Sequence, residues 1–491
     1  MNVQGKSIQY CLSEARKVLS SDTTISASVR VVMELMIFVI EALSLRVIGR
    51  KSKTSSTAPS QDPNREKTKP AEKKGREKLK PGGQNGHKGN HLEPVEHPDE
   101  VVKLSLDRRK VRLSPDFRCV GYEKRQVFDI AISVHVVEYQ AEVWENGTGD
   151  RVVAEFPSEV TSPTQYGPKI KAHAVYNSVA QYLSSERGSE YFSDISGFRL
   201  SEGSIFNFKK KAYELLAPFE EQLINHLKLE SLIHNDETGI NINSKQHWIH
   251  STSSPHLTLY IPHKKRGYDA TFEIGILPVF RGFSMHDGWV SYFKYKLCKH
   301  VLCNAHHLRE LEALIETTEL RWPKTIKRLL LKAHSEVTKL PQQKLSPRRV
   351  ASYHRRFSMI LRVAHLECPA AKKDPHKKGK VKQTKARNLL LRLEKYQKET
   401  LAFIEHTEVP FTNNLAERDI RMAKLQQKVS GLFKTLEGAR IFCRIRSYLS
   451  TCRKNGINPI TALTALFTGR LQEILLQIFK LESQIPPPQE F

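Results

Sequence analysis

The sequence predicts a multidomain α+β protein whose mixed α/β core is interrupted by a helical insertion. Three observations lead to this fold class. The chain has 491 residues, enough for several domains of roughly 150 residues each. Short apolar runs alternate with helical stretches from residue 229 onward, and residues 320–406 are then long, basic and helical in pattern. Residues 49–90 have no apolar period, which indicates a linker.

The N-terminal part predicts a helix, the linker and a pair of strands. Residues 26–48 are apolar on nearly every side of a helix, which predicts burial in their own domain or against a second copy. The Ser-, Pro-, Gly- and Lys-rich linker (49–90) suits either solvent or a phosphate backbone. Residues 129–147 and 150–157 alternate in polarity around an Asn-Gly pair, which predicts an antiparallel hairpin.

A helix pair is predicted between residues 165 and 228. The first helix ends at Gly197, and Ser201 caps a second helix that carries Lys209, Lys210 and Lys211. A glycine turn before a basic second helix is typical of a helix-turn-helix that binds DNA. Two helices that merely pack together give the same pattern, so both interpretations stay open.

Charge is the strongest signal in the composition. The chain has 78 Lys and Arg against 52 Asp and Glu, a formal net charge of +26. Such an excess favours a polyanionic partner, with nucleic acid ahead of an anionic membrane surface. The longest apolar stretch, residues 31–45, includes Glu34 and Glu41 and is shorter than the ~20 residues a membrane span needs. Seven scattered cysteines and the lack of a signal-peptide pattern predict a cytoplasmic protein.

Three acidic residues occupy positions that suggest a shared site. The predicted first strand of the core ends at Asp236, the fourth ends at Asp287, and Glu417 lies on a late helix. In a ribonuclease-H-like fold these positions converge at one edge of the sheet, where carboxylates hold Mg²⁺ (or Mn²⁺) for phosphodiester chemistry. Each also has an ordinary explanation, since strand ends often carry a turn Asp and Glu417 fits a capping box after Asn413 or Asn414.

Motifs around these residues carry a family resemblance. In chain order they include "KPGGQNGHKGNHL", "YGPKIKAHAVY", "DISGFRLSEGSIFN", "HNDETGI", "SMHDGW", "CNAHHLRELE", "TNNLAERDIRMAK" and "SYLSTCRKNGINPITALTALFTG". Together they resemble the insertion sequence 66 family of bacterial transposases, over roughly residues 45–468 and in the same order. Ordered agreement of several motifs is far more specific than any one of them.

The resemblance implies a DDE transposase. Such an enzyme binds the terminal inverted repeats of its element and performs metal-dependent strand cleavage and strand transfer. By motif, Asp236 of "DET", Asp287 of "HDGW" and Glu417 of "NNLAERDIR" match the catalytic, metal-binding triad. The residues that we expect to meet DNA phosphates on the Glu417 helix are Arg418, Arg421 and Lys424.

The implied partners follow from that chemistry. They are double-stranded DNA of the element ends and target, further copies of the chain on DNA, and accessory proteins of the element, in the cytoplasm and nucleoid of a bacterium. Two other functions stay open. One is an inactive DNA-binding relative that holds ends or represses transcription, and the other is a nuclease that hydrolyses without joining.

The cysteines and histidines predict no zinc. The family often has a zinc-binding module after the linker, but this chain retains only Cys119 of it. The segment "CKHVLCNAHH" has spacings that zinc tolerates, although the resemblance of "CNAH" to a core strand end favours packing or support for the acidic site. Its candidate ligands are Cys298, His300, Cys303, His306 and His307.

Supporting roles are predicted for three residues near the acidic positions. These are His286, Cys303 and His306. His286, beside Asp287, either bonds phosphate or a metal-bound water or is incidental. Trp248 and Trp289 are expected in the core, with base stacking as the alternative if they are exposed.

The predicted architecture is thus a ribonuclease-H-like α/β catalytic core with a helical insertion, flanked by helical and small β DNA-binding regions. Its divisions are a helical region (1–48), the linker (49–90), a small β-rich domain with a degenerate zinc module (91–160), a helix-turn-helix-like region (161–228), the catalytic domain (229–440) with its insertion (320–406), and a helical region with a Pro-rich tail (441–491).

Overall fold

The computed structural model describes residues 94–104, 122–129, 133–371, 381, 383–430 and 433–479, together with scattered residues between 2 and 39. The predicted linker (49–90), Cys119 and the Pro-rich tail lie outside the described residues. The chain divides into two compact units, Met1–Ser133 and Val134–Phe491. No helix among the described residues is long and apolar enough to cross a membrane.

The first unit contains a short hairpin and a helix. Strands β1 (Asn2–Val3) and β2 (Lys6–Ser7) pair antiparallel, and residues 29–37 are helical. Most described side chains of this helix are exposed, including Leu35 at 63%, while Ile37 is buried at 7%. The prediction that the helix is buried in its own domain is therefore wrong for most of these side chains, and cover by a second copy stays a prediction.

The second unit starts with a hairpin that is shorter than predicted. Strands β3 (Val143–Glu145) and β4 (Arg151–Val153) pair antiparallel, with Val143 opposite Val153. The loop is closed by Asn146, whose side chain accepts hydrogen bonds from the backbone N–H groups of Thr148 and Asp150. The predicted Asn-Gly pair thus lies in the loop between the strands, but the first strand is much shorter than predicted, because residues 133–142 form no strand.

Four described helices of the second unit precede the sheet. They are α3 (Pro168–Val179), α4 (Ser185–Ser196), α5 (Glu202–Leu215) and α6 (Ala217–Leu229). Gly197 ends α4 in the left-handed conformation, with φ of 75°, which glycine adopts without steric cost. Ser201 accepts a hydrogen bond from the N–H of Ser204 at 3.0 Å and so caps α5. Both predicted cap positions are confirmed.

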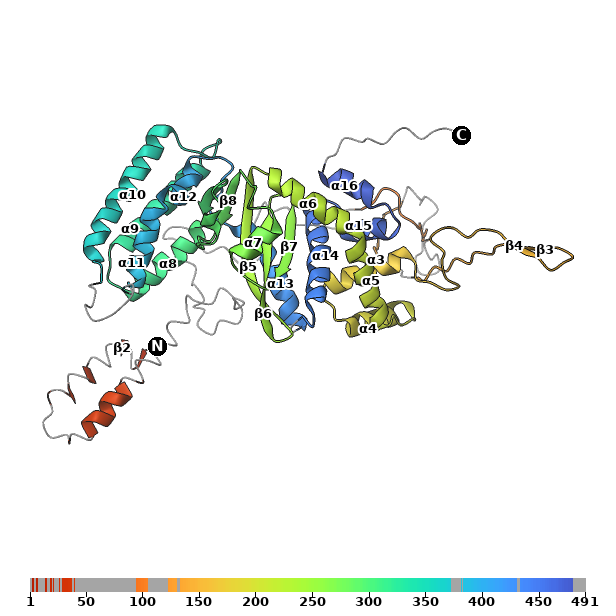
Figure 1. The fold of residues 1–491 in the computed structure, drawn as a ribbon, viewed down its shortest axis with the longest axis horizontal. Coiled ribbons are helices and arrows are strands. Elements are labelled where there is room, and N and C mark those ends of the chain that lie inside the picture. The colour runs from red at the N-terminus through yellow and green to blue at the C-terminus, as the bar shows by residue number, and fades with distance from the viewer. Residues whose placement is uncertain are drawn as a thin grey trace, which may run out of the picture. The chain divides into compact units, whose positions relative to one another are not determined.

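A five-stranded mixed sheet forms the centre of the unit (Figure 1). Its order is β7-β6-β5-β8-β9, from β5 (Leu232–Ile242), β6 (Lys245–Ser253), β7 (Thr258–His263), β8 (Phe283–His286) and β9 (Lys299–Leu302). Strands β5, β6 and β7 pair antiparallel, and β5, β8 and β9 pair parallel. Asp236 therefore lies within β5 and does not end it, because the β5–β6 hairpin continues to Ile242.

Helices complete the unit on either side of the sheet (Figure 1). The remaining elements are α7 (Tyr268–Ile274), the 3₁₀ turn η2 (Tyr292–Lys294), α8 (Asn304–Thr317), α9 (Trp322–Thr338), α10 (Pro347–Glu367), α11 (Lys385–Lys395), α12 (Gln397–Leu401), η3 (Ala402–Ile404), α13 (Asn414–Ser430), α14 (Leu436–Lys454), α15 (Pro459–Phe467) and α16 (Leu471–Phe479).

Two apolar cores hold these layers together. One joins β5, β6 and β7 to α3, α6, α14, α15 and α16, with Phe219 and Tyr448 fully buried at its centre. The other joins β8 and β9 to α8 and to α9–α12, the helices within residues 320–406, through Met285, Trp322 and Phe357. Burial of a large aromatic or aliphatic side chain is worth roughly 1.5–3 kcal/mol, so both cores stabilise the sheet between them. The described chain is a mixed α+β protein.

Candidate active site

Neighbouring strands of the sheet place three side chains in one row. Strands β5 and β8 pair in parallel with His234 opposite Met285, and Asp236 and Asp287 each lie two residues further on. The β8–β9 register carries the same row to Cys303. Adjacent strands are ~4.8 Å apart, and the carboxyl ends of parallel strands are the usual place for a ligand. We call Asp236, Asp287 and Cys303 the strand-end row.

Asp236 lies in an acidic, partly buried environment. The pKa of its carboxyl is raised to about 8, first by burial and then by the charges of Glu237, Asp287 and Glu417. The N–H of Glu237 donates to Asp236 Oδ1 at 2.9 Å, which acts in the opposite direction. A cation beside these groups removes the repulsion that raises the pKa.

Glu237 points to the opposite face of the sheet, as alternation along a strand requires. Its side chain is 2% exposed. It accepts a hydrogen bond from Tyr292, and Arg266 Nε donates to it at 2.8 Å. Burial raises the pKa of Glu237, while Tyr292 and Arg266 act to lower it. These two donors compensate a carboxylate that burial alone would disfavour.

Arg266 links the buried Glu237 to the strand-end row. Its guanidinium lies 4.0 Å from the ring centroid of Trp289 and 4.9 Å from that of Trp248. It also lies 4.0 Å from Asp287 Oδ2. Both predicted core aromatics are thus half-buried supports for a cation, an arrangement that cation–π attraction favours.

Glu417 projects from the first turn of α13. Its backbone N–H donates to the carbonyl of Asn413 at 3.1 Å, so the helix starts directly after Asn413. The Asn413 side chain bonds His234 at 2.7 Å and the Asn235 carbonyl at 3.0 Å, which ties the start of α13 to β5. The N–H of Asn413 donates to Cys303 Sγ at 3.1 Å. Because that N–H is already used, a capping box with Glu417 is not formed.

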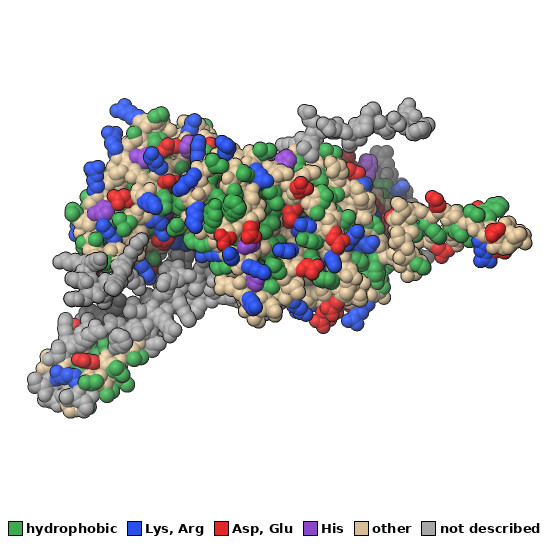
Figure 2. Space-filling model, viewed as in Figure 1, with side chains coloured by type: hydrophobic (Ala, Val, Ile, Leu, Met, Phe, Trp, Pro, Cys, Tyr) green, Lys and Arg blue, Asp and Glu red, His purple; other side chains and the backbone are tan. Residues whose placement is uncertain are grey.

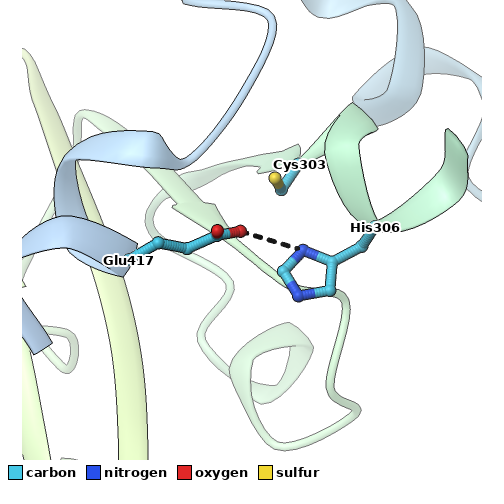
Figure 3. Close-up of side chains that lie close together, drawn as sticks. All are labelled: Cys303, His306 and Glu417. Carbon is cyan, nitrogen blue, oxygen red and sulfur yellow. Dashed lines mark ion pairs between the residues drawn. The ribbon is translucent and has the colours of Figure 1, made fainter. Parts of the chain in front are cut away.

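The carboxylate of Glu417 faces α8 (Figure 3). Arg309 donates to its Oε1 at 2.9 Å, and His306 Nδ1 lies 3.7 Å from the same atom. Candidate ligand atoms of Cys303, His306 and Glu417 all lie within 4.8 Å of one another. Among the described residues this is the group of three that meets, and Asp236, Asp287 and Glu417 do not form an equally tight group.

Asp419 holds α13 against the sheet from the other side of the helix. It accepts hydrogen bonds from Ser253 at 2.7 Å and Thr258 at 3.1 Å. Lys454 of α14 donates to it at 2.8 Å, and the side chains of this ion pair are 12% and 14% exposed. A buried, fully bonded pair of this kind is strongly destabilised when one partner is removed. Asp419 therefore positions Glu417 two residues earlier.

A family model described as "Transposase IS66 family" matches residues 163–441, more than half of the 491-residue chain. The chain belongs to this family. Comparison with curated protein sequences gives no match. The matched residues include the strand-end row and Glu417, and the family resemblance predicted from the motifs is confirmed. Membership implies a role in DNA transposition, with DNA as partner.

In this IS66-family chain, His286 supports the fold and does not face a ligand. It is fully buried, and burial holds its pKa well below the usual value. Its Nδ1 accepts from the N–H of Gly288 at 3.1 Å, and its Nε2 lies 3.0 Å from His300 Nδ1. His300 in turn bonds the Tyr295 carbonyl at 2.8 Å. With both nitrogens engaged, the predicted bond to phosphate or a metal-bound water is not available.

The predicted DNA-contacting residues of the family member differ in exposure. Lys210 and Lys211 on α5 are exposed, whereas Lys209 is half-buried and burial lowers its pKa. On α13, Arg418 and Arg421 are exposed and lie one turn apart, beside Glu417. Lys424 is half-buried, and its pKa is lowered by burial first and by Lys428 second.

Five residues around the site were not predicted from the sequence. Glu237 and Asp419 are adjacent or nearly adjacent to predicted ligands in the motifs "DET" and "ERD", which was a usable signal. No sequence pattern indicated Tyr292, Arg309 or Arg266, because only the fold brings these side chains to the carboxylates.

Proposed function

We propose that this IS66-family chain is a DDE transposase with a ribonuclease-H-like core. It binds the terminal inverted repeats of its element and catalyses DNA strand cleavage and strand transfer, with Asp236, Asp287 and Glu417 as the metal-binding catalytic residues. The observation that carries the proposal is the parallel register, which sets Asp236 beside Asp287 under the start of α13. Three antiparallel strands continued by two parallel ones support such a core.

The residues present fit a divalent cation. The pKa of Asp236 is raised to about 8 by burial and by three further carboxylates, so the cluster has more negative charge than its protein surroundings compensate. Carboxylate oxygens are the ligands that Mg²⁺ and Mn²⁺ prefer. Asp236, Asp287 and Glu417 would hold such ions, which would supply activation of an attacking hydroxyl and stabilisation of the leaving oxygen of a phosphodiester.

The chain itself supplies orientation and charge around the substrate. Asn413 and Asp419 fix α13 on the sheet, and this sets the position from which Glu417 reaches the strand-end row. Arg266 holds Glu237 and lies 4.0 Å from Asp287, which puts positive charge beside the strand-end row. Arg309 must release Glu417 when that carboxylate turns toward the row.

Exposed basic residues on α9 and α13 suit a DNA backbone. Lys324, Arg328 and Lys332 are exposed at intervals of four on α9, which places them on one helix face. Figure 2 shows further Lys and Arg side chains over the insertion, in the part that contains α10. With Arg418 and Arg421 on α13, these residues offer phosphate contacts on two helices.

The test is strand cleavage and joining of a labelled duplex that carries the element end. We expect the unmodified protein to give both products with Mg²⁺, and Asp287→Asn and Glu417→Gln to lose both while they still bind the duplex. The matched control is Glu437→Gln, which changes an exposed glutamate in the first turn of α14 and should keep both products.

Other outcomes point to the two alternatives. Nicks without joined strands indicate a hydrolytic nuclease. End binding by the unmodified protein with no product, when accessory proteins of the element are present, indicates an inactive DNA-binding relative. Homo-oligomerisation is checked in the same mixtures by light scattering of the protein–DNA complex.

A further inference from the structure

A sulfur, an imidazole and a carboxylate meet where β9 turns into α8 (Figure 3). Cys303 follows the last residue of β9, His306 lies three residues later in the first turn of α8, and Glu417 reaches across from α13. Their candidate ligand atoms lie within 4.8 Å of one another. Small side-chain rotations bring three such atoms to the ~2.0–2.3 Å that a bound Zn²⁺ requires.

The donor chemistry differs from that of an all-oxygen site. Thiolate and imidazole favour borderline cations such as Zn²⁺ and Co²⁺ over Mg²⁺. His306 Nδ1 is inaccessible to solvent and has no hydrogen-bond partner, and at 3.7 Å from Glu417 it is too far to bond it. A buried nitrogen without a partner is costly, and a metal bond would satisfy it.

The surroundings also support a thiolate ligand. The backbone N–H of Asn413 donates to Cys303 Sγ at 3.1 Å, the kind of outer bond that orients a ligand and stabilises its charge. Three protein ligands leave a fourth position for water, as in open zinc sites. Arg309, which now bonds Glu417, has a side chain that is 45% exposed, so it can move into solvent at low cost.

We propose that Cys303, His306 and Glu417 form a binding site for a borderline divalent cation of the Zn²⁺ class. The site shares Glu417 with the proposed catalytic triad, and this part of the proposal rests on the proposed function. One carboxylate side chain cannot bind a cation beside Cys303 and His306 and another beside Asp236 and Asp287 at the same time. Occupancy by Zn²⁺ therefore withholds Glu417 from Asp236 and Asp287 and inhibits strand cleavage.

The proposal departs from the expectation of no zinc for a specific reason. The sequence prediction of no zinc takes its candidate ligands only from within the segment "CKHVLCNAHH". The structure divides that segment, with Cys298 and His300 bonded to each other and to Tyr295 on the far side of β9. The third ligand, Glu417, lies 111 residues beyond His306 and could not be identified from spacing.

The test is a Co²⁺ titration of the full chain, reduced with a phosphine and free of Mg²⁺. We expect one high-affinity Co²⁺ per chain, with a thiolate-to-cobalt charge-transfer band in the near ultraviolet and visible bands of a four-coordinate ion. Cys303→Ser should lose the charge-transfer band. His306→Gln and Glu417→Gln should weaken Co²⁺ binding by more than ~100-fold, since even outer-shell changes cost up to that much.

The matched control is Cys298→Ser, which removes the other buried thiol of the segment and should keep the band unchanged. Far-ultraviolet circular dichroism establishes that each variant is folded. No thiolate band in the unmodified protein at saturating Co²⁺ would overturn the proposal, and so would a band that persists in Cys303→Ser. This readout requires no DNA chemistry, so it stands or falls independently of the proposed transposase activity.

The inhibitory consequence has a separate readout. Zn²⁺ affinity is measured by displacement of Co²⁺ from the unmodified protein, and strand cleavage in Mg²⁺ is then followed as Zn²⁺ is added. Cleavage should fall with a midpoint at that Zn²⁺ affinity. Full cleavage at saturating Zn²⁺ would show that Glu417 is not shared, and would overturn the inhibitory part of the proposal.

Discussion

The carboxylates on the sheet and those on α13 are neutralised in different ways. Glu237 and Asp287 share the guanidinium of Arg266, and the pKa of Asp236 beside them is raised to about 8. On α13 each acid has a partner of its own, with Glu417 bonded to Arg309 and Asp419 to Lys454.

This difference separates two tasks. On the helix side of the site, the carboxylates of α13 are neutralised by basic side chains of the protein, and these ion pairs hold α13 in place. The sheet side has unbalanced negative charge, which is what a site for an external cation requires. A metal ion at the sheet is therefore attracted mainly by the sheet carboxylates. It can bind Glu417 only if it displaces Arg309 from that side chain.

Loss of the Asp419 anchor should have the largest effect. Asp419→Ala leaves Lys454 buried without its counter-ion, which we expect to lower the free energy of unfolding by ~3–5 kcal/mol. The start of α13 also loses two hydroxyl contacts, so strand cleavage should be lost as well. Urea denaturation and the cleavage assay check the two effects.

A paired variant separates charge from packing at the same position. Asp419→Asn with Lys454→Met removes both charges while it keeps the side chain that Ser253 and Thr258 bond. We expect this double variant to recover most of the lost stability, as replacement of buried ion pairs by neutral groups commonly does. A double variant as unstable as Asp419→Ala would show that the ion pair is not what holds α13.

The next effect concerns pH on the sheet side. The folded protein keeps the Asp236 proton up to pH about 8, whereas an unfolded chain releases it near ~4. Between these values the folded state binds more protons, so its stability falls as the pH rises. Without metal, Asp236→Asn should therefore have about the same free energy of unfolding as the unmodified protein near pH 4. Near pH 9 its free energy of unfolding should be higher by ~3 kcal/mol, a value that allows for the partial exposure of the side chain.

Urea denaturation in a chelator at several pH values measures this difference. Asp194→Asn, at an exposed position on α4, is the control and should show no such trend. If the gain from Asp236→Asn is the same at every pH, the proton is not held in the folded state. The sheet side would then be as well neutralised as the helix side.

The sequence predicted the acidic positions better than their surroundings. Asp287 directly follows β8, as the apolar run before it predicted, because a short buried strand is bounded by its polar neighbours. Asp236 was placed at a strand end, but the hairpin partner Ser251 extends β5 past it. The partners of Glu237 and Glu417, such as Arg266 and Arg309, come from distant elements. No local sequence pattern predicts contacts that only tertiary packing creates.

The same limit explains the early helix and the cysteine segment. Residues 29–37 are helical, as their pattern predicted, yet a pattern cannot name what covers an apolar surface. The segment around Cys303 has metal-binding side chains at tolerable spacing, but whether they converge depends on which face of the strand and helix each occupies. Local periodicity predicted the elements, while the site depends on their register.

The smallest effect should come from Arg309, and it compares the two sides of the site directly. Arg309 is partly exposed, so its pair with Glu417 is worth at most ~1 kcal/mol. Arg309→Gln should leave stability nearly unchanged and tighten Co²⁺ binding at Cys303, His306 and Glu417 by about 5-fold, which is the same free energy expressed as affinity.

The control for a general loss of positive charge is Arg328→Gln, which replaces an exposed arginine on α9. Equal gains in both variants would mean that net charge alone tunes the site, and no gain in either would mean that Glu417 is available to a cation without displacing Arg309.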